Sequence, residues 1–309
     1  MQTPIQPIDS TWTILRLLQW TSDYFQSRDI DSPRMTAEIL LAHALQLRRL
    51  DLYLRYDLPL GVDELALFKK LVKRRVRREP TAYITGSKGF WTLDLAVNSH
   101  VLIPRPETER LVETAVSVLP EATETVPSPR RVLELGTGSG AIILALAAER
   151  PANIYVALDK SCHALEVARR NAARNELGEA VQFLCSDWYD ALKPGGTEFD
   201  LVVSNPPYIR SSDLAGLQPE IKEYEPVSAL DGGEDGLDCI RHIVAAAPNF
   251  LTAGGWLLLE IGFDQGAAVE RIASQASRYD KWRLVQDLSG NDRVACLRKS
   301  AIPERKSEN

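Results

Sequence analysis

A short stretch past the middle of the chain, Asn205-Pro206-Pro207-Tyr208, combines an amide, a free carbonyl and an aromatic ring. It follows the apolar run 200–204, which is typical of a buried parallel strand. The prolines fix φ and lack an N–H, so they end the strand and stiffen the loop. An amide or amine nitrogen would find two acceptors here, Asn205 Oδ1 and the Pro206 carbonyl, and a ring face. A simple strand-ending turn is the alternative interpretation.

A glycine-rich segment upstream predicts a nucleotide-type binding loop. Its residues are Gly136, Thr137, Gly138, Ser139 and Gly140, between an apolar run at 131–135 and a helix expected over 141–150. Glycines at a strand-to-helix turn let the backbone approach a ligand, and the helix N-terminus adds N–H donors. The same segment also satisfies the GxGxxA dinucleotide fingerprint. Asp159 ends the next strand and suits a ribose hydroxyl pair in either class of enzyme.

Three features favour S-adenosylmethionine over a dinucleotide. Glu134 precedes the glycine loop, where a carboxylate would repel a pyrophosphate but attract the amino group of a sulfonium cofactor. Asp187 and Trp188 follow the strand expected over 181–184 and offer an acceptor and a ring to an adenine. The acidic balance of this part of the chain also suits a positive sulfonium. The alternatives are a carboxylate serving the helix dipole for Glu134 and a core aromatic for Trp188.

A parallel sheet is needed to bring these residues together. Strands and helices alternate after residue 130, which predicts an α/β fold with a mostly parallel, Rossmann-like sheet covered on both faces. Ligands of such sheets bind at the carboxyl ends of the strands. The expected strands are 131–135, 154–158, 181–184, 200–204, 256–261, 282–285 and 294–298, and the expected helices are 141–150, 162–175, 238–251 and 265–277, with a long loop over 209–235.

The segment before the sheet mixes strand and helix signals. Residues 90–97 alternate and predict one strand, with which 101–103 is expected to pair as a hairpin. A helix is expected over 110–118, with Glu107 and Glu109 in its first turn, where carboxylates suit the helix dipole. The polar, proline-rich residues 121–129 predict a linker.

The first 85 residues predict a small helical bundle. Its expected apolar stripes are Trp12, Leu15, Leu18 and Phe25, then Ile39, Leu40, Ala44 and Leu47, then Leu65, Phe68, Leu71, Val72 and Val76. The third helix ends in a basic run over 69–78. This run is either a nucleic-acid contact or a solvated helix face, and we favour the second.

The charge distribution argues against a stable nucleic-acid partner. Up to Thr85 there are 13 basic and 10 acidic residues, and after it 23 and 32. An acidic main domain is poorly suited to gripping a phosphate backbone. No apolar run approaches the roughly 20 residues that span a bilayer, and the N-terminus does not resemble a signal peptide. Four dispersed histidines and four cysteines without a CxxC pair (Cys162, Cys185, Cys239 and Cys296) predict reduced thiols, a cytoplasmic location and no metal site.

These motifs together resemble a known family. The segment 134–140 is similar to motif I of the class I methyltransferases, and with 205–208 it resembles the amino-methyltransferases, which modify planar nitrogens. The flanking motifs resemble the release factor glutamine methyltransferases of the HemK/PrmC family. They are Gly86 with Phe90-Trp91, then Leu102 to Glu109, Glu225-Pro226 with Ala229-Leu230, Gly232 to Leu237, and Gly290 to Val294. The similarity runs from about Leu40 to Arg298.

The resemblance implies methylation of the side-chain nitrogen (N5) of the glutamine in the Gly-Gly-Gln loop of peptide chain release factors. It implies that the glycine loop at 136–140 lines the methionine part of S-adenosylmethionine, that Asp159 binds the ribose, and that Asp187 and Trp188 hold the adenine. Asn205, Pro206, Pro207 and Tyr208 would hold the glutamine amide, with Asn205 also near the cofactor. Glu107, Thr108 and Glu134 are further candidates for contact with the cofactor.

The domain organisation expected from this resemblance has four parts. A substrate-recognition bundle covers 1–85, a hairpin and linker helix 86–128, the methyltransferase domain 129–300, and a disordered tail 301–309. A monomer is expected. Three other functions stay open: a nucleic-acid methyltransferase acting on an exocyclic amine (adenine N6 or guanine N2) of a base stacked on Tyr208, a non-catalytic scaffold, and a nicotinamide dehydrogenase.

Overall fold

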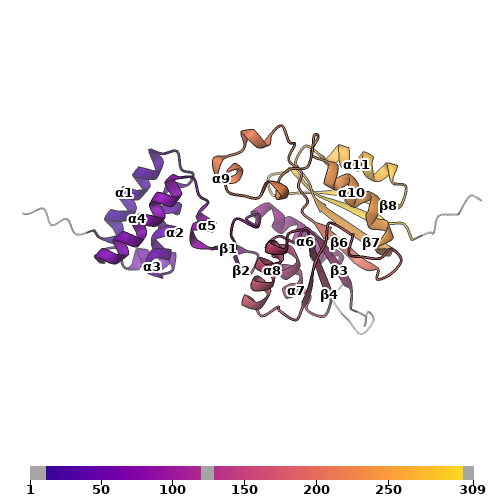
Figure 1. Ribbon diagram of the computed structural model, residues 1–309, viewed down its shortest axis with the longest axis horizontal. Coiled ribbons are helices and arrows are strands. Elements are labelled where there is room, and N and C mark those ends of the chain that lie inside the picture. Colours follow the sequence, from indigo (N-terminus) through magenta and orange to yellow (C-terminus); the bar gives the residue numbers. More distant parts are fainter. Residues whose placement is uncertain (1–11, 120–128, 302–309) are drawn as a thin grey trace, which may run out of the picture. The chain divides into compact units, whose positions relative to one another are not determined.

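The computed structural model describes residues 12–119 and 129–301, and the chain divides into two compact units, Met1–Gly86 and Ser87–Asn309 (Figure 1). Most of the linker predicted over 121–129 lies outside the described residues, as does the tail predicted over 301–309 apart from its first residue.

The first unit is helical. Its helices are α1 (Ile14–Gln26), α2 (Pro33–Leu45), α3 (Arg49–Leu54), α4 (Val62–Val76) and α5 (Thr81–Thr85). The short helices α3 and α5 were not predicted. The stripe predicted for the first helix is partly wrong, because Trp12 precedes the helix and Leu15 is 48% exposed, whereas Ile14 and Leu17 are buried. Thr13 caps the helix, so the buried face is counted from Ile14.

Part of the basic run at the end of α4 is structural. Arg74 pairs with Glu79 at 2.7 Å, and Arg75 is buried. Arg78 donates to the backbone carbonyls of Arg28 and Asp29 at 2.9 and 2.8 Å. These contacts close the end of the helix onto its own unit. The solvated face favoured for the run is therefore wrong for Arg75, which is buried.

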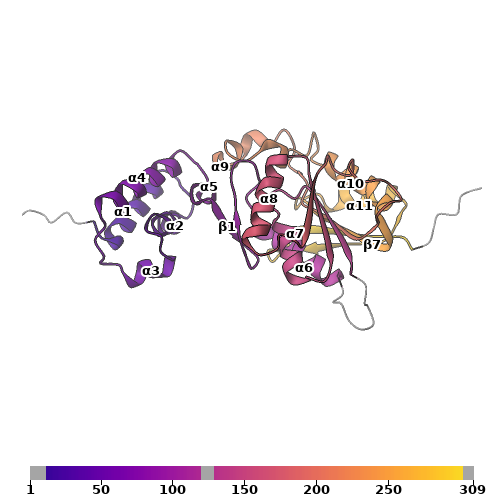
Figure 2. The same cartoon turned by 60° about the horizontal axis from the view of Figure 1, so that its bottom comes forward.

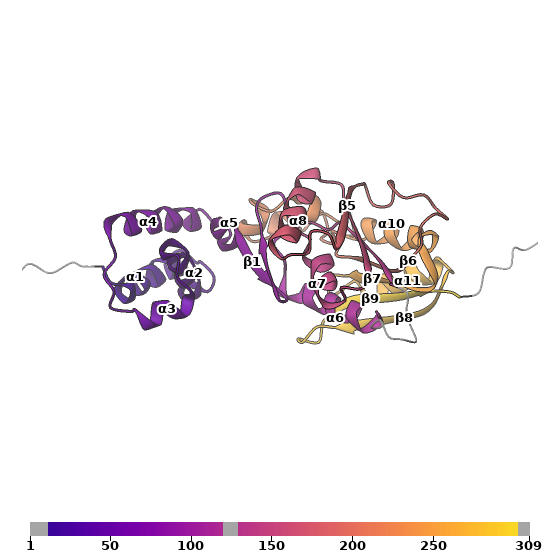
Figure 3. The same cartoon turned by 90° about the horizontal axis from the view of Figure 1, so that it is seen from below.

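The second unit contains a seven-stranded sheet in the order β5-β4-β3-β6-β7-β9-β8. The strands are β3 (Arg131–Leu135), β4 (Ile154–Asp159), β5 (Val181–Cys185), β6 (Phe199–Ser204), β7 (Leu251–Glu260), β8 (Tyr279–Gln286) and β9 (Asp292–Lys299). The five from β5 to β7 pair in parallel, and β9 and β8 join antiparallel at one edge (Figure 3). The predicted mostly parallel α/β fold is confirmed.

Helices cover both faces of this sheet, as Figure 2 shows. On one face lie α6 (Glu109–Val118), α7 (Ala141–Glu149) and α8 (Cys162–Arg174), and on the other α10 (Asp238–Ala246) and α11 (Gly266–Gln275). Successive residues of β6 alternate between the two cores: Leu201 and Val203 pack in one and Val202 in the other. Burial on both faces explains why the central strands read as unbroken apolar runs.

The strand predicted over 90–97, paired with 101–103, is wrong. The chain forms a hairpin of β1 (Ser87–Phe90) and β2 (Leu93–Ala96), and residues 101–103 form no strand. Trp91 takes the turn with φ of +54°. Glycine or asparagine normally signals such a turn, and neither is present at Trp91-Thr92. The alternation of apolar and polar residues therefore gave no sign that a strand ends there.

Helix α10 ends at Ala246, earlier than predicted, before a 3-10 turn that contains Pro248.

The loop predicted over 209–235 contains short helical pieces. These are two 3-10 turns, Leu214–Gly216 and Val227–Ala229, and α9 (Pro219–Lys222) between them. An isolated parallel bridge pairs Ile209 with Asp231, so both ends of the loop are anchored near the end of β6.

Candidate functional site

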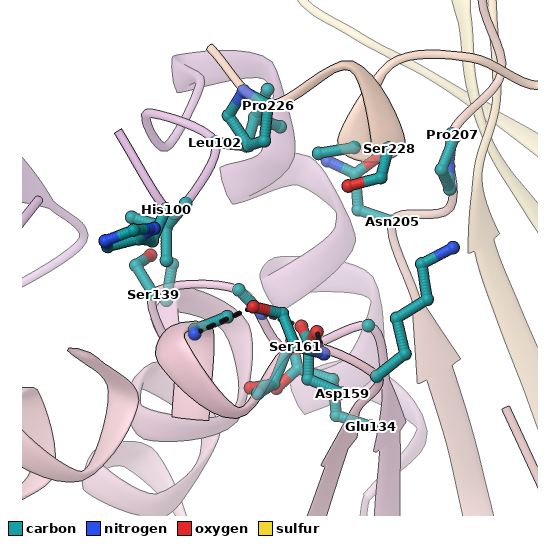
Figure 4. Close-up of a pocket in the computed structure, with 18 of the residues that line it drawn as sticks. His100, Leu102, Glu134, Ser139, Asp159, Ser161, Asn205, Pro207, Pro226 and Ser228 are labelled. Atoms are coloured by element: carbon teal, nitrogen blue, oxygen red, sulfur yellow. Dashed lines mark hydrogen bonds between the residues drawn. The ribbon is translucent and has the colours of Figure 1, made fainter. Parts of the chain in front are cut away.

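A cavity of about 650 Å³ opens at the carboxyl ends of β3, β4 and β6. Figure 4 shows Glu134, Asp159 and Ser161 gathered on one side of it, and Asn205 with Ser228 on the other. A cavity of this size is in the range of small-molecule and cofactor sites.

The glycine loop forms the turn from β3 into α7. Gly136, Gly138 and Gly140 all have φ between +54° and +83°, where side chains are strained. At Gly140 a Cβ would also lie 3.1 Å from Leu144 Cδ1 and 3.3 Å from Ala168 Cβ. The loop is fixed to β4 by the Thr137 N–H, which donates to the Leu158 carbonyl at 3.0 Å. Glycine is therefore required at these three positions, where the backbone forms part of the cavity wall.

Asp159 ties the glycine loop to the start of α8. Its Oδ2 accepts from the Gly138 N–H and its Oδ1 from the Ser161 N–H, both at 2.8 Å. Ser161 in turn caps α8 by accepting from the Ala164 N–H at 3.2 Å. Burial raises the pKa of Asp159, against the lowering effect of these backbone donors.

Glu134 is a buried carboxyl on the cavity wall. It is 1% exposed and accepts a hydrogen bond from the Thr137 hydroxyl. Burial raises its pKa to about 8, and the nearby Asp159 carboxylate adds to the rise. A buried carboxyl of this kind gains most from a cationic group brought into the cavity.

Asp187 and Trp188 line the cavity just beyond β5. Trp188 has φ of +45° and also packs against the core beneath α10. The Trp188 ring therefore lines the cavity, as a residue that binds adenine would, and also packs against the core, as the alternative interpretation expected. The Ser186 N–H donates to the Asp159 carbonyl at 3.0 Å, so the ends of β4 and β5 share one wall.

The Asn205-Pro206-Pro207-Tyr208 segment follows β6 as predicted. The Asn205 Nδ2 group donates to the buried Thr108 hydroxyl at 3.3 Å. The Tyr208 hydroxyl donates to Glu260 Oε1 at 3.2 Å. Glu260 is 1% exposed, and burial raises its pKa to about 7 against lowering hydrogen bonds from Thr108 and Tyr208. The two ends of the segment are thus held by neighbouring buried partners.

Most of the predicted site residues meet at this cavity. Those that line it are Thr108, Glu134, Gly136, Thr137, Gly138, Ser139, Asp159, Asp187, Trp188, Asn205 and Pro207. Gly140, Pro206, Tyr208 and Glu107 are not among the lining residues, and Glu107 is exposed. Thr108, rather than Glu107, is therefore the member of that pair that faces the cavity.

Asn171 was missed by the sequence analysis. This residue of α8 is fully buried, and its side chain makes three hydrogen bonds: from the Ala96 N–H at 2.7 Å, to the Ala96 carbonyl at 3.0 Å and to the Ser139 carbonyl at 2.8 Å. The signal was present, since Asn171 stands among the apolar positions of an amphipathic helix. It joins the end of β2 to the glycine loop.

An ion pair across the cavity rim was also missed. Arg105 Nη2 lies 2.7 Å from Glu225 Oε1, and the Glu225 side chain is almost completely buried. Residues 226–229 follow Glu225 and line the cavity. The pair therefore anchors the loop that follows β6 to the segment before α6.

The described residues contain neither a group of metal ligands nor a membrane-spanning helix. Within residues 12–119 and 129–301, no group of histidine, cysteine and acidic side chains could hold a metal ion. None of the helices in these ranges is long and apolar enough to cross a membrane.

Comparisons with known proteins agree with this architecture. Residues 16–86 match the PrmC N-terminal domain model, and residues 110–217 match the methyltransferase small domain model. A release factor glutamine methyltransferase of Geobacter sulfurreducens is 44% identical over 283 residues, covering 92% of this chain and 95% of that protein. One of Xylella fastidiosa is 48% identical over 261 residues, covering 84% and 91%.

A solved structure supports the fold. The human methyltransferase 10 domain containing protein superposes with a TM-score of 0.50 at 17% identity, over 69% of this chain and 90% of that one. At this identity the similarity extends to the fold alone.

Proposed function

The chain belongs to the release factor glutamine methyltransferase family, and on that basis we propose that it methylates the side-chain amide nitrogen (N5) of the glutamine in the Gly-Gly-Gln motif of peptide chain release factors, with S-adenosylmethionine as donor. The observation that carries the proposal is that Asn205 opens onto the same cavity as the glycine loop and Glu134. A planar amide and a cationic cofactor can therefore meet in one site.

The donors and acceptors around the cavity fit S-adenosylmethionine. We assign Glu134 and the glycine loop to the methionine part, Asp159 to the ribose, and Asp187 with Trp188 to the adenine. A buried carboxyl beside the glycine loop suits the cationic end of an adenosine compound better than a pyrophosphate, whereas Asp159 would suit the ribose of either. When bound, the cofactor supplies an electrophilic methyl group.

Asn205 and Pro206 would orient the substrate amide. The Asn205 nitrogen already donates to Thr108, which turns Oδ1 away from Thr108 as an acceptor for a substrate N–H. The Pro206 carbonyl would accept the second N–H, and the Tyr208 ring would pack on the amide plane. Both acceptors are held by a stiff proline loop, so little reorganisation is needed during the reaction.

Orientation matters because a primary amide is a weak nucleophile with a delocalised lone pair. Holding its two N–H groups lets the nitrogen pyramidalise as it attacks, and positioning of this kind can contribute roughly 7–11 kcal/mol in good cases. The methylated amide nitrogen would lose its extra proton to water without a general base. A glutamate in place of glutamine would bring negative charge to two acceptors, and each mispaired buried group costs about 1–3 kcal/mol.

We expect the helical first unit and the loop over 209–235 to hold the release factor, and we place the activity in translation termination in the cytoplasm. A monomer without a stable nucleic-acid partner stays our prediction. The names of the relatives favour the release factor over a nucleic acid as the methyl acceptor.

The test is transfer of a labelled methyl group from S-adenosylmethionine to purified release factor and, separately, to total RNA and DNA. We expect label on the glutamine of the Gly-Gly-Gln motif, lost when that glutamine is replaced by glutamate or asparagine. Label on nucleic acid alone would overturn the proposed substrate but keep the cofactor. No transfer from a folded protein that binds the cofactor would favour a scaffold.

A further inference from the structure

Two cysteines far apart in the sequence meet beside the cavity. Cys162 is the first residue of α8 and Cys185 the last residue of β5, and their Sγ atoms lie 2.9 Å apart. Both side chains are exposed. All four cysteines are free thiols, as predicted. The packing of α8 beside β5 nevertheless brings together two of them that the sequence separates by 23 positions.

The backbone around both cysteines is firmly held. Cys185 is paired with Asp159 across β4 and β5, and Cys162 follows Ser161, which caps α8. The Asp159 carboxylate also accepts from the Ser161 N–H. A bonded pair of sulfurs lies roughly 2.05 Å apart, so the two exposed Sγ atoms, now 2.9 Å apart, need to approach by less than about 1 Å.

We propose that Cys162 and Cys185 form an intramolecular disulfide on exposure to a small disulfide oxidant such as glutathione disulfide, making the pair a redox modification site at the edge of the cavity. The thiolate of one cysteine attacks one sulfur of the oxidant, breaks its S–S bond and releases one glutathione thiolate, which takes up a proton. The thiolate of the other cysteine then attacks the cysteine sulfur of the mixed disulfide and releases the second glutathione. The two cysteines lose two protons and two electrons, and the oxidant is reduced to two thiols.

Either sulfur can donate the hydrogen bond between the two thiols, so either thiolate can attack the oxidant first. The bond raises the pKa of Cys185. A Cys185→Ser variant should trap glutathione on Cys162, and a Cys162→Ser variant should trap it on Cys185.

The position of the bond indicates its effect on the cavity. Lys160 and Ser161 precede Cys162, Ser186 and Asp187 follow Cys185, and all four line the cavity. A bond here joins these two parts of the wall close to their present spacing, and so preserves the shape of the wall. We expect oxidised protein to bind S-adenosylmethionine within about threefold of reduced protein. This second effect rests on the proposed function, whereas disulfide formation does not.

The experiment incubates the full chain with glutathione disulfide and maps its peptides by mass spectrometry without reduction. We expect a Cys162–Cys185 linked peptide in the wild type and in Cys239→Ser, and none in Cys162→Ser or Cys185→Ser. Of these four proteins, only the wild type and Cys239→Ser should show a higher midpoint of thermal unfolding after oxidation.

Two results would overturn the proposal: thiols that stay reduced or only glutathionylated in the wild type, or linkage through Cys239 or between two chains. A loss of cofactor affinity beyond threefold in the mapped, oxidised protein would contradict only the preserved shape of the wall. Absence of cofactor binding in reduced and oxidised protein alike would count against the proposed function and leave the disulfide standing.

Discussion

The Asn205 side-chain nitrogen donates a hydrogen bond to the Thr108 hydroxyl at 3.3 Å, between residues 97 positions apart in the chain. Thr108 is 3% exposed, so water competes little for this contact. With its nitrogen on Thr108, the Asn205 amide leaves its oxygen as the end available to a substrate donor. In the proposed role of Asn205, a residue from another element therefore sets the orientation of the amide.

Replacing Asn205 tests the orienting role directly. Asn205→Ala should lower turnover by at least about 100-fold, because one of two acceptors for the substrate amide is lost. The affinity for S-adenosylmethionine should change little. Single-turnover methyl transfer and calorimetry would measure the two effects, and near-wild-type turnover would exclude the proposed role.

Thr108 should act through Asn205. Thr108→Val keeps the shape but removes the oxygen that accepts from Asn205, so we expect turnover to fall about tenfold, equivalent to about 1.4 kcal/mol. Thr108→Ser retains the hydroxyl and is the matched control. Cofactor affinity is measured alongside, because Thr108 also lines the cavity and a loss of affinity in the valine variant would instead indicate a contact with the cofactor. Equal turnover in the valine and serine variants would contradict the orienting role.

The roles of the ring and of the hydroxyl of Tyr208 can be tested separately. The hydroxyl bonds to Glu260, whereas the proposed contact with the substrate uses the ring face. Tyr208→Phe should therefore keep turnover within about threefold, and Tyr208→Ala should lose at least about tenfold, because only the alanine removes the packing surface. If the phenylalanine variant were as impaired as the alanine variant, the hydroxyl would be the functional group.

The buried Glu134 should make stability depend on pH. Its pKa is about 8 in the folded protein against 4.5 for an ordinary glutamate. Between these values the folded protein keeps a proton that the unfolded chain has lost, so this contribution to stability is present below about pH 4.5 and disappears as pH rises through about 8.

Glu134→Gln removes this dependence. Relative to wild type, the variant should gain on the order of 2–4 kcal/mol in free energy of unfolding between about pH 5 and about pH 8. Urea denaturation without cofactor measures it. Glu260→Gln is the matched comparison, and its gain should end near pH 7, where the pKa of Glu260 lies. Parallel curves for wild type and Glu134→Gln would show that Glu134 does not titrate there.

Asn171 should support both stability and cofactor binding. Asn171→Leu leaves the Ala96 N–H and the Ala96 and Ser139 carbonyls without this partner, which should cost about 2–4 kcal/mol and weaken S-adenosylmethionine binding through the glycine loop. Asn175→Leu, which loses two bonds at the C-cap of α8, is the control and should leave affinity unchanged. Unaltered affinity in a folded Asn171→Leu protein would rule out the connection to the loop.

Much of the site was predictable because parallel strands place their carboxyl ends together. Asp159 and Asn205 each follow an apolar run, so local patterns alone assign them to one edge of the sheet. The turn at Trp91 was not predictable, since a tryptophan with positive φ gives no turn signal.

The tertiary contacts could not be read from local patterns. The bond from Asn205 to Thr108 and the meeting of Cys162 with Cys185 depend on how distant segments pack. Asn171 was predictable in part. A polar residue on the apolar face of a helix indicates a buried hydrogen bond, but the sequence does not show which residue is the partner.

The single amide of Asn171 bonds to Ala96 at the end of the hairpin and to Ser139 in the glycine loop, and this shared contact should couple the two segments. A ligand that stiffens the loop stiffens the end of β2 as well, because both depend on one side chain. Linkage is reciprocal, so a macromolecule that bound the hairpin more tightly in the presence of cofactor would raise cofactor affinity by the same factor. The order in which cofactor and macromolecule bind would then follow from the coupling of their binding equilibria and would need no change of conformation.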